Sequence, residues 1–323
     1  HYRKGREIIE VATFRTGDNK KATKSSKGLV LRDNTYGNIQ DDAFRRDFKI
    51  NALYLDIHSM EIIDYTGGYK DLENRKLSCI GDSKVRFRED PVRIIRAIRF
   101  MSSIELDCKD SLKSDIYGLA NLLEEVPTAR RYEEVLKLFF TGSAAKTFDK
   151  LIKYKVLKYL LPATSRYLEE EKSDKKIIQF IKLALKNSDS RVIKDLPLTP
   201  AFLFSVLLWP AVVKRIGEIQ SSKIKIPLLR KAADKAIREQ NSHCFIPNRV
   251  ESMIKDIWEF QIRLLKVKSP KITSLISHKR FRASYDFLIL REQSGVNLNG
   301  CGKWWTDVQN KSEHRKKDLS KRQ

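Results

Sequence analysis

Two arginines and an aspartate, Arg45, Arg46 and Asp47, stand side by side between a short helical pattern at 39–44 and an apolar run at 48–57. Planar guanidinium groups donate paired hydrogen bonds, which suits them to phosphate groups and nucleobase edges. The adjacent aspartate can hold the arginines in place or ligate a metal ion. The alternative is a solvated charge cluster at the end of an element, because surface ion pairs are common and weak.

The elements that must position this triplet are predicted from the apolar pattern. The run at 48–57 indicates a buried strand, so the triplet lies at a helix-to-strand junction. Alternation over 8–15 indicates another strand, with Glu10 on a largely apolar face. A carboxylate there is costly unless it is paired or bound to a cation, so Glu10 is a candidate metal ligand; the alternative is a glutamate at the rim of an edge strand. A further strand is predicted at 62–65, with a turn at 67–68.

A second group of candidate residues lies where the strand pattern ends and helices begin. Asp90 and Pro91 predict a helix N-terminus, and Arg93 falls in its first turn, where a cation opposes the helix dipole. Asp90 and Arg93 are three residues apart, so they can meet on one face and offer an acceptor and donors to a nucleobase edge. The alternative is an N-cap with a local ion pair. Arg96 and Arg99 continue the basic side of this helix.

The rest of the chain is predicted to be helical. Helices are expected at 110–123, 129–141, 144–160, 172–186, 200–214 and 250–268. Arg130 and Arg131 open the second of these, again at the end that disfavours cations, and are candidate triphosphate or RNA contacts. Residues 310–323 are dense in Lys and Arg without apolar periodicity, which predicts a disordered basic tail that contacts phosphates through residues such as Lys316 and Lys317.

The composition is strongly basic. Lys and Arg number 64 against 41 Asp and Glu, a net charge of +23, which favours a polyanionic partner. The four cysteines lack Cys-x-x-Cys spacing, so neither a zinc site nor a disulfide framework is indicated, and a reducing, cytoplasmic location is expected. The most apolar run, 201–213, is well short of the roughly 20 residues of a membrane-spanning helix, and no membrane partner is expected.

Five blocks of the sequence carry a family resemblance. They are Ile8–Arg15, Leu31–Gly37, Arg45–Leu53, Asp64–Leu72 and Glu89–Phe100. Together they resemble the class II nucleotidyltransferases, which comprise the tRNA CCA-adding enzymes and the bacterial poly(A) polymerases. The block at 31–37 resembles the poly(A) polymerase branch, as do the segments at 200–204, 281–286 and 303–305.

The resemblance implies an α+β fold: a partial nucleotidyltransferase palm sheet at 1–80, a helical, base-recognising neck at 81–150, a helical, RNA-binding body at 151–309, and the basic tail. The implied reaction is template-independent addition of AMP from ATP to RNA 3′ ends, with Mg²⁺ as the cofactor. Two alternatives remain: a CCA-adding tRNA nucleotidyltransferase, which uses CTP as well as ATP, and a non-catalytic RNA-binding protein.

The resemblance also implies roles for single residues. Asp47 and Glu10 would supply catalytic carboxylates, and Glu10 would also bind the metal ion. The nucleotide would be contacted by Arg46, Asn51, Asp90, Arg93, Arg96 and Arg99. The family holds two magnesium ions on an Asp-x-Asp strand, and these 323 residues contain no such motif. In the family it precedes the strand that corresponds to 8–15, so we expect this chain alone to be inactive, as a fragment of an enzyme or a decayed remnant.

Overall fold

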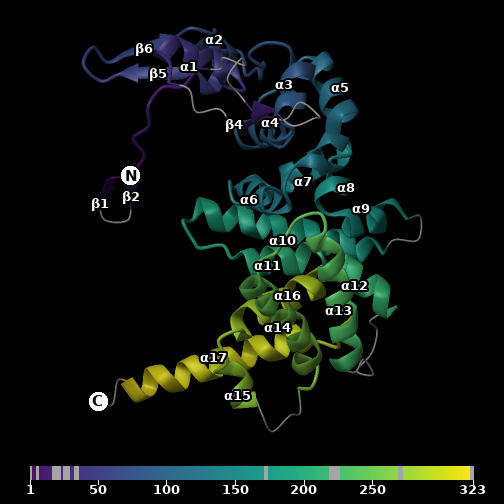
Figure 1. Cartoon of the computed structure of the whole chain (residues 1–323). Coiled ribbons are helices and arrows are strands. Elements are labelled where there is room, and N and C mark those ends of the chain that lie inside the picture. Colours follow the sequence, from purple (N-terminus) through teal and green to yellow (C-terminus); the bar gives the residue numbers. More distant parts are fainter. Residues whose placement is uncertain are drawn as a thin grey trace. The chain divides into compact units, whose positions relative to one another are not determined.

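The computed structural model describes the backbone of residues 2–4, 7–16, 23–24, 30–32, 36–170, 174–217, 226–267 and 272–320 (Figure 1). The chain divides into two compact units, His1–Val126 and Pro127–Gln323. The division falls inside the segment 81–150 that we expected to form a single neck. Each unit is described by itself below.

The strands of the first unit form three separate antiparallel pairs. They are β1 (Tyr2–Lys4) with β2 (Glu7–Ile9), β3 (Thr23–Lys24) with β4 (Val30–Arg32), and β5 (Leu53–Asp56) with β6 (Glu61–Asp64). The strand predicted at 8–15 is wrong beyond Ile9, and Arg15 forms only an isolated bridge to Tyr36. A strand persists where a neighbouring strand takes up its N–H and C=O groups. Among the described residues, 10–14 form no ladder with another strand, although the Phe14 carbonyl accepts from the Gly37 N–H at 3.1 Å. Val11 is accordingly 80% exposed.

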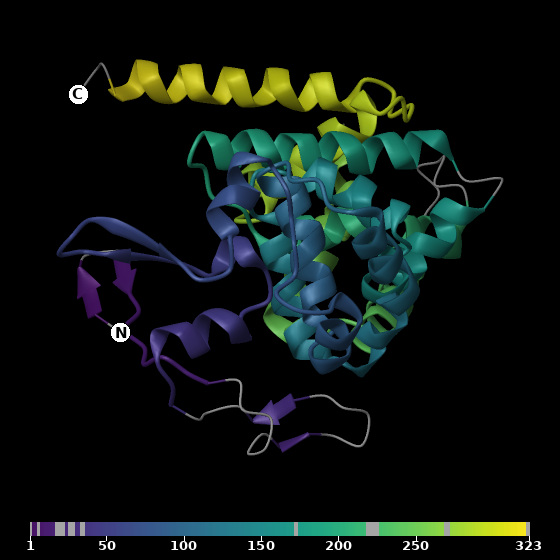
Figure 2. The same cartoon turned by 90° about the horizontal axis from the view of Figure 1, so that it is seen from above.

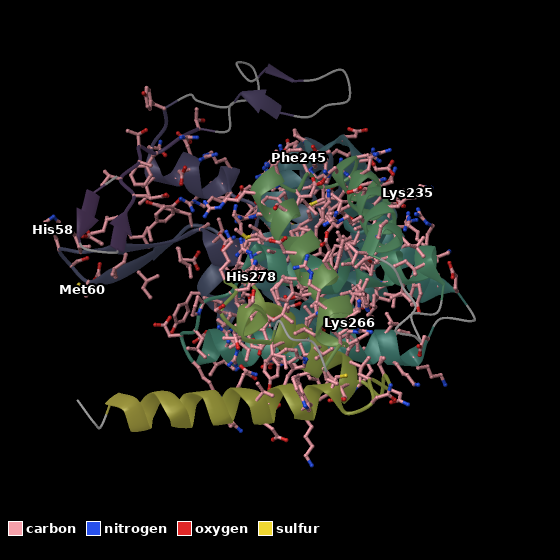
Figure 3. All side chains as sticks on the ribbon, turned by 90° about the horizontal axis from the view of Figure 1, so that it is seen from below. His58, Met60, Lys235, Phe245, Lys266 and His278 are labelled. Carbon is pink, nitrogen blue, oxygen red and sulfur yellow. The ribbon has the colours of Figure 1, made fainter. Side chains whose placement is uncertain are left out.

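The apolar run after Asp47 does not form one buried strand. A 3₁₀ turn, η1 (Lys49–Asn51), intervenes before β5, and Phe48 bridges to Cys79 instead. The β5–β6 hairpin pairs Leu55 with Ile62, and these residues are 54% and 55% exposed, so the prediction of burial is wrong. Two strands have too little apolar area to bury a face by themselves. The strand predicted near β6 is confirmed, and His58 and Met60 lie at the outer tip of the hairpin (Figure 3).

The described part of the first unit also contains helices. They are α1 (Ile39–Arg45), α2 (Gly68–Glu73), α3 (Ser83–Glu89), α4 (Val92–Ser103), α5 (Asp110–Leu119) and the 3₁₀ helix η2 (Ala120–Glu125). Asn38 caps α1 in a capping box, which fixes where that helix begins. α4 buries Ile94, Ile95 and Ile98 in the core of the unit, and this leaves its arginines on the opposite, more accessible side.

The second unit consists of helices joined by turns and loops, with no strand among its described residues (Figures 1 and 2). Its helices are α6 (Thr128–Phe139), α7 (Ala144–Lys153), α8 (Leu157–Leu160), α9 (Pro162–Glu169), α10 (Lys175–Ile193), α11 (Pro200–Leu207), α12 (Trp209–Ile216), α13 (Ile226–Asn241), α14 (Asn248–Leu264), α15 (Ile272–Ile276), α16 (Phe281–Gln293) and α17 (Cys301–Ser320). α14 packs on α11, α13 and α16. Trp209 and Trp258 are fully buried in the core between them.

Two of the predicted helices are broken in the structure. The helix predicted at 144–160 ends at Lys153 and restarts at Leu157, and Lys155 between them has a positive φ of 54°. The helix predicted at 200–214 is interrupted at Leu208, because Pro210 cannot donate an N–H to the preceding turn and therefore starts a new helix.

The predicted disorder of the basic tail is wrong up to Ser320, because α17 continues through this segment. Trp305 anchors the start of α17: it is fully buried, and its indole N–H donates to the Leu264 carbonyl at 2.8 Å. Once a helix is anchored, adding further residues is cheap, and Lys, Arg and Glu are good helix formers. The side chains of Lys316 and Lys317 lie outside the described residues.

All four cysteines are free thiols, as expected from their spacing. Among the helices that the structure describes, none is long and apolar enough to cross a membrane.

Candidate functional site

Asp42, on α1, binds Arg45 and Arg46, the two arginines of the charged triplet. Its carboxylate is 3% exposed and accepts hydrogen bonds from Arg45 Nε (3.0 Å), Arg46 Nε (2.9 Å) and the Tyr54 hydroxyl (2.9 Å). Burial raises the pKa of Asp42, but the bonds from Arg46, Tyr54 and Arg45 outweigh it and lower that pKa to about 2. Asp42 is therefore ionised under all ordinary conditions and holds both arginines in place.

Arg46 is held in place but remains accessible. Its Nη1 donates to the Asn51 carbonyl at 3.2 Å, and its guanidinium carbon lies 5.4 Å from the centre of the Tyr54 ring. Burial lowers the pKa of Arg46, but the bond to Asp42 and the neighbouring Tyr54 more than offset this and raise it. The side chain is still 41% exposed. A fixed, half-exposed guanidinium is suited to binding an anion. The nucleotide contact expected of Arg46 stays a prediction.

Asp47 connects the segment before η1 to α4. Its carboxylate accepts from the Phe48 N–H (3.0 Å) and Asn51 Nδ2 (2.9 Å), and it forms an ion pair with Arg96 Nε. Burial raises the pKa of Asp47, but the bond and charge of Arg96 and the bond from Asn51 outweigh it, so that pKa is lowered. The structure thus brings together three predicted residues, Asp47, Asn51 and Arg96. The Asp47 carboxylate accepts its hydrogen bonds from groups of the protein itself.

Arg86 and Glu89, on α3, extend the same network. Arg86 Nη2 donates to the backbone carbonyls of Arg45 and Arg46, and its Nη1 bonds Glu89 Oε2 at 2.7 Å. Glu89 Oε2 also accepts from Arg93 Nη1 at 3.0 Å. Burial and the neighbouring Arg93 charge lower the pKa of Arg86. Glu89 is therefore shared between two guanidinium groups.

The predicted pair Asp90 and Arg93 is arranged differently from the expectation. Arg93 does lie in the first turn of α4, but its Nη1 donates to Glu89 and to the Arg86 carbonyl at 2.9 Å. Asp90 follows the last residue of α3 and precedes Pro91, the N-cap of α4, and its carboxylate accepts from the Val92 N–H at 3.2 Å. Glu89 ends α3 and Arg93 lies in the first turn of α4, so the bend of the chain at Asp90 and Pro91 lets the two side chains meet.

The other arginines of α4 lie against an aromatic ring. The guanidinium carbons of Arg96 and Arg99 are 5.6 Å and 5.1 Å from the centre of the Phe100 ring. Such cation–π contacts fix an arginine while leaving N–H donors available. Both predicted nucleotide contacts are consequently ordered on one side of the helix.

Sequence reasoning missed four members of this network: Asp42, Tyr54, Arg86 and Glu89. A signal for three of them was present, because Asp42 precedes Arg45 and Arg46 by three and four residues, and Arg86, Glu89 and Arg93 follow each other at spacings of three and four. Tyr54 had no such signal, since it reaches Asp42 only through the fold of β5.

Glu10 does not lie on a buried apolar face as predicted, because the strand that would have buried it ends at Ile9 and its side chain is exposed. In the part of the chain that the structure describes, no three His, Cys, Asp or Glu side chains gather to hold a metal ion. The described residues therefore do not fit a complete magnesium site.

The two arginines that open α6 differ in exposure. Arg130 is exposed, as an RNA contact requires, whereas Arg131 is 4% exposed and directs Nη1 toward the Tyr159 carbonyl at 3.4 Å. The prediction of an RNA contact is thus wrong for Arg131. Adjacent helical residues point about 100° apart, so only one of the two can face solvent fully.

Three models of protein families match the chain. "Poly A polymerase head domain" matches residues 1–78, "Probable RNA and SrmB- binding site of polymerase A" residues 109–168, and "Polymerase A arginine-rich C-terminus" residues 222–323. The poly(A) polymerase I of Haemophilus influenzae is 36% identical over 335 aligned residues, which cover 100% of this chain and 73% of that protein.

Two further comparisons concern tRNA enzymes. The CCA-adding enzyme of Lactobacillus helveticus is 33% identical over 145 residues, 45% of this chain and 35% of that protein. A solved tRNA nucleotidyltransferase, complexed with a primer tRNA and an incoming ATP analogue, is similar in fold with a TM-score of 0.58 and 19% identity, and the match covers 87% of this chain and 75% of that one.

Proposed function

The chain belongs to the family of bacterial poly(A) polymerases, which are nucleotidyltransferases, and we propose that it serves the template-independent addition of AMP from ATP to RNA 3′ ends, with release of pyrophosphate. The sequence similarity to the poly(A) polymerase I of Haemophilus influenzae extends over the whole chain, whereas that to the CCA-adding enzyme of Lactobacillus helveticus covers 45% of it, which favours the former reaction. Processing of mRNA in the cytoplasm is part of the proposal.

One observation carries the assignment of the nucleotide site. Direct hydrogen bonds or ion pairs join Arg46, Asn51, Asp47 and Arg96, although these residues come from η1, from α4 and from the segment between α1 and η1. Proteins that bind triphosphates need fixed cations, because a guanidinium that is already in place loses little conformational entropy when the anion binds. Arg46 and Arg96 are the cations that we assign to the phosphates.

Arg93 is the residue that we assign to the base. Glu89 and the Arg86 carbonyl fix one nitrogen of its guanidinium, and the other nitrogens can donate to a base edge. Asp90, at the start of the same helix, offers a carboxylate as the acceptor. Reading adenine with protein side chains replaces a nucleic-acid template in this proposal.

The reaction needs magnesium ions, and this limits which steps of the reaction we assign to this chain. When bound, two magnesium ions would activate the attacking hydroxyl group and neutralise the leaving pyrophosphate. The described residues do not gather carboxylates for them, and the sequence has no Asp-x-Asp. We therefore assign nucleotide selection and RNA binding to this chain and derive no step through the metal.

The RNA-binding surface is assigned to the second unit. Arg130 is exposed on α6, and the net charge of +23 favours contact with a polyphosphate backbone. Helix α17 presents the basic tail as a continuous rod rather than as a flexible segment.

Equilibrium binding tests the proposal directly. We expect the chain to bind a short oligoadenylate, and to bind ATP more tightly than CTP, GTP or UTP when each displaces a fluorescent ATP analogue. With oligoadenylate, ATP and magnesium we expect no extension of the RNA by the chain alone. Equal affinity for all four nucleotides would contradict the assignment of adenine selection. Extension of the RNA would contradict the expectation that this chain alone does not catalyse the reaction.

A further inference from the structure

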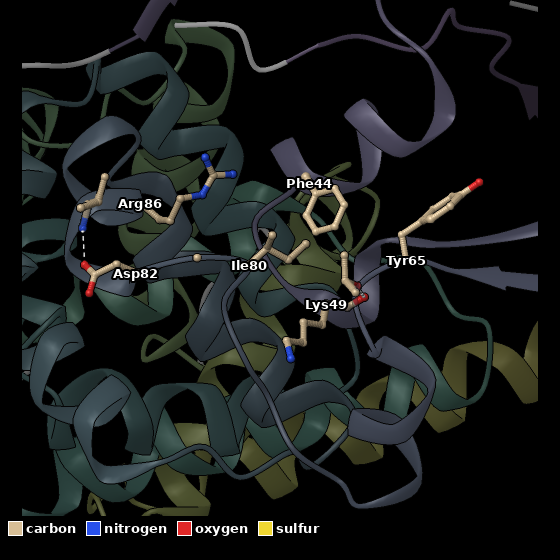
Figure 4. Close-up of a pocket in the computed structure, with 9 residues that line it drawn as sticks. Phe44, Lys49, Tyr65, Ile80, Asp82 and Arg86 are labelled. Carbon is tan, nitrogen blue, oxygen red and sulfur yellow. Dashed lines mark hydrogen bonds between the residues drawn. The ribbon is translucent and has the colours of Figure 1, made fainter.

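A pocket lies in the first unit, beside the network described above. It has a volume of about 640 Å³ and is open to solvent (Figure 4). Its lining comes from the end of α1, η1, the turn after β6, the loop at 80–82 and the start of α3: Phe44, Lys49, Tyr65, Thr66, Ile80, Gly81, Asp82, Val85 and Arg86. None of the residues assigned to the incoming nucleotide lines it.

The walls of this pocket are tied together by the backbone. The Lys49 N–H donates to the Ser78 carbonyl and the Ile80 N–H to the Asp47 carbonyl, each at 3.0 Å. On the other side, Gly68 packs so tightly on the Lys49 carbonyl that a Cβ there would lie 2.1 Å from its oxygen. Only glycine permits this close approach. The pocket is therefore formed before any ligand arrives.

The chemistry of the lining combines rings with positive charge. Phe44 is 51% exposed and Tyr65 is 38% exposed, which is unusual for large aromatic side chains. No carboxylate among the described residues pairs with the Lys49 ammonium. The Arg86 guanidinium is 15% exposed, and its Nε–H is buried without an acceptor among the described residues.

The one acidic residue of the lining does not cancel these charges. Asp82 directs its carboxylate at the Val85 N–H, at 3.0 Å, where it caps α3 (Figure 4). Arg86 is paired with Glu89, outside the lining, so the Lys49 ammonium is the cation that the pocket offers next to exposed aromatic surface.

We propose that this pocket binds one nucleotide of the RNA substrate, with the base against Phe44 and Tyr65 and the phosphate at Lys49. Aromatic rings accept any base by stacking, and adjacent cations follow the phosphate, which is the combination found in sites for single-stranded nucleic acid. The open rim favours a chain over a free nucleotide, because a polymer must enter and leave on both sides. The inference rests on the proposed function, since it specifies where that RNA is held.

Fluorescence anisotropy with a labelled oligoadenylate tests the pocket. Phe44→Ala and Tyr65→Ala combined should weaken RNA binding about tenfold, whereas Tyr65→Trp should keep it. Lys49→Gln should reduce the slope of log affinity against log salt by about 0.7, the value for one phosphate of a single strand. Tyr69→Ala and Lys70→Gln are matched controls, because both residues are exposed on α2 outside the pocket, and they should change these quantities little.

RNA binding by the wild-type chain and by the pocket variants tests the proposed function and the proposed pocket separately. Wild-type chain that binds RNA, with pocket variants equal to the α2 controls, would overturn the pocket alone and leave the function standing. Wild-type chain that binds no RNA would overturn both. Weaker ATP binding with unchanged RNA binding in the pocket variants would show a free-nucleotide site and contradict the assignment to RNA. Thermal melting of each variant verifies that it is folded.

Discussion

The Asp47 carboxylate pairs with the Arg96 guanidinium across 49 residues of sequence, and this contact joins the segment before η1 to the middle of α4. Asp47 is 7% exposed. A buried carboxylate that is fully satisfied by a guanidinium, an amide and a backbone N–H fixes the position of α4, on which Arg93 also lies.

Removing one partner of this pair should be costly. Arg96→Ala leaves the Asp47 carboxylate buried with less compensation, and we expect a loss of about 2 kcal/mol in the free energy of unfolding. This is below the roughly 3–5 kcal/mol of a fully buried pair, because the Arg96 side chain is 31% exposed. Urea denaturation measures it. The double variant Asp47→Ala/Arg96→Ala should lose less than the sum of the single losses, and strictly additive losses would show that the pair is not coupled.

Acid should destabilise the first unit through Asp42. Its pKa in the folded chain is about 2, below the ordinary 3.8, so its contribution to stability is fully present above pH 4 and is lost as the pH falls toward 2. We therefore expect the stability difference between wild type and Asp42→Asn to be constant near neutral pH and to shrink from pH 4 to pH 2. Urea midpoints recorded against pH measure it, and a difference that does not shrink would contradict the folded pKa.

Arg130 and Arg131 should give opposite phenotypes. Arg130→Ala should weaken RNA binding and leave the melting temperature unchanged, because its side chain is exposed. Arg131→Ala should lower the melting temperature, because it removes a buried side chain. Oligoadenylate affinity and thermal melting of both variants measure the two effects. Equal loss of RNA affinity in folded samples of both variants would contradict the distinction.

The basic tail should account for part of the salt dependence of RNA binding. Each phosphate contacted by a cation contributes about −0.7 to the slope of log affinity against log salt. Deleting Asn310–Gln323 should therefore flatten the slope, while the buried anchor at Trp305 is retained. A deletion variant with an unchanged slope would exclude the tail from the RNA-binding surface.

The sequence predicted the parts of the site that depend on local spacing. The helix before Arg45, the first turn of α4 at Arg93 and the helical second unit follow from caps, prolines and apolar periodicity, and the structure confirms them. The contact between Asp47 and Arg96 could not be predicted, because no rule of spacing links residues 49 positions apart.

The predictions of burial and exposure that were wrong share a physical cause. Alternating residues near Glu10 and Leu55 predicted buried strands, but burial of a strand depends on the sheet that covers it, which periodicity does not specify. Arg131 was misplaced for a similar reason, since the face of α6 that packs inward is decided by its neighbours in the fold.

We proposed that Arg93, held by Glu89, selects adenine, and the affinities of Arg93→Ala for the four nucleoside triphosphates test this most directly. Arg88→Ala is the matched control, because Arg88 is an exposed arginine on α3. A paired contact to a base is worth about 1–3 kcal/mol, so we predict that Arg93→Ala loses about tenfold of its preference for ATP while Arg88→Ala keeps it. A folded Arg93→Ala variant that is less stable but equally selective for ATP would contradict the account.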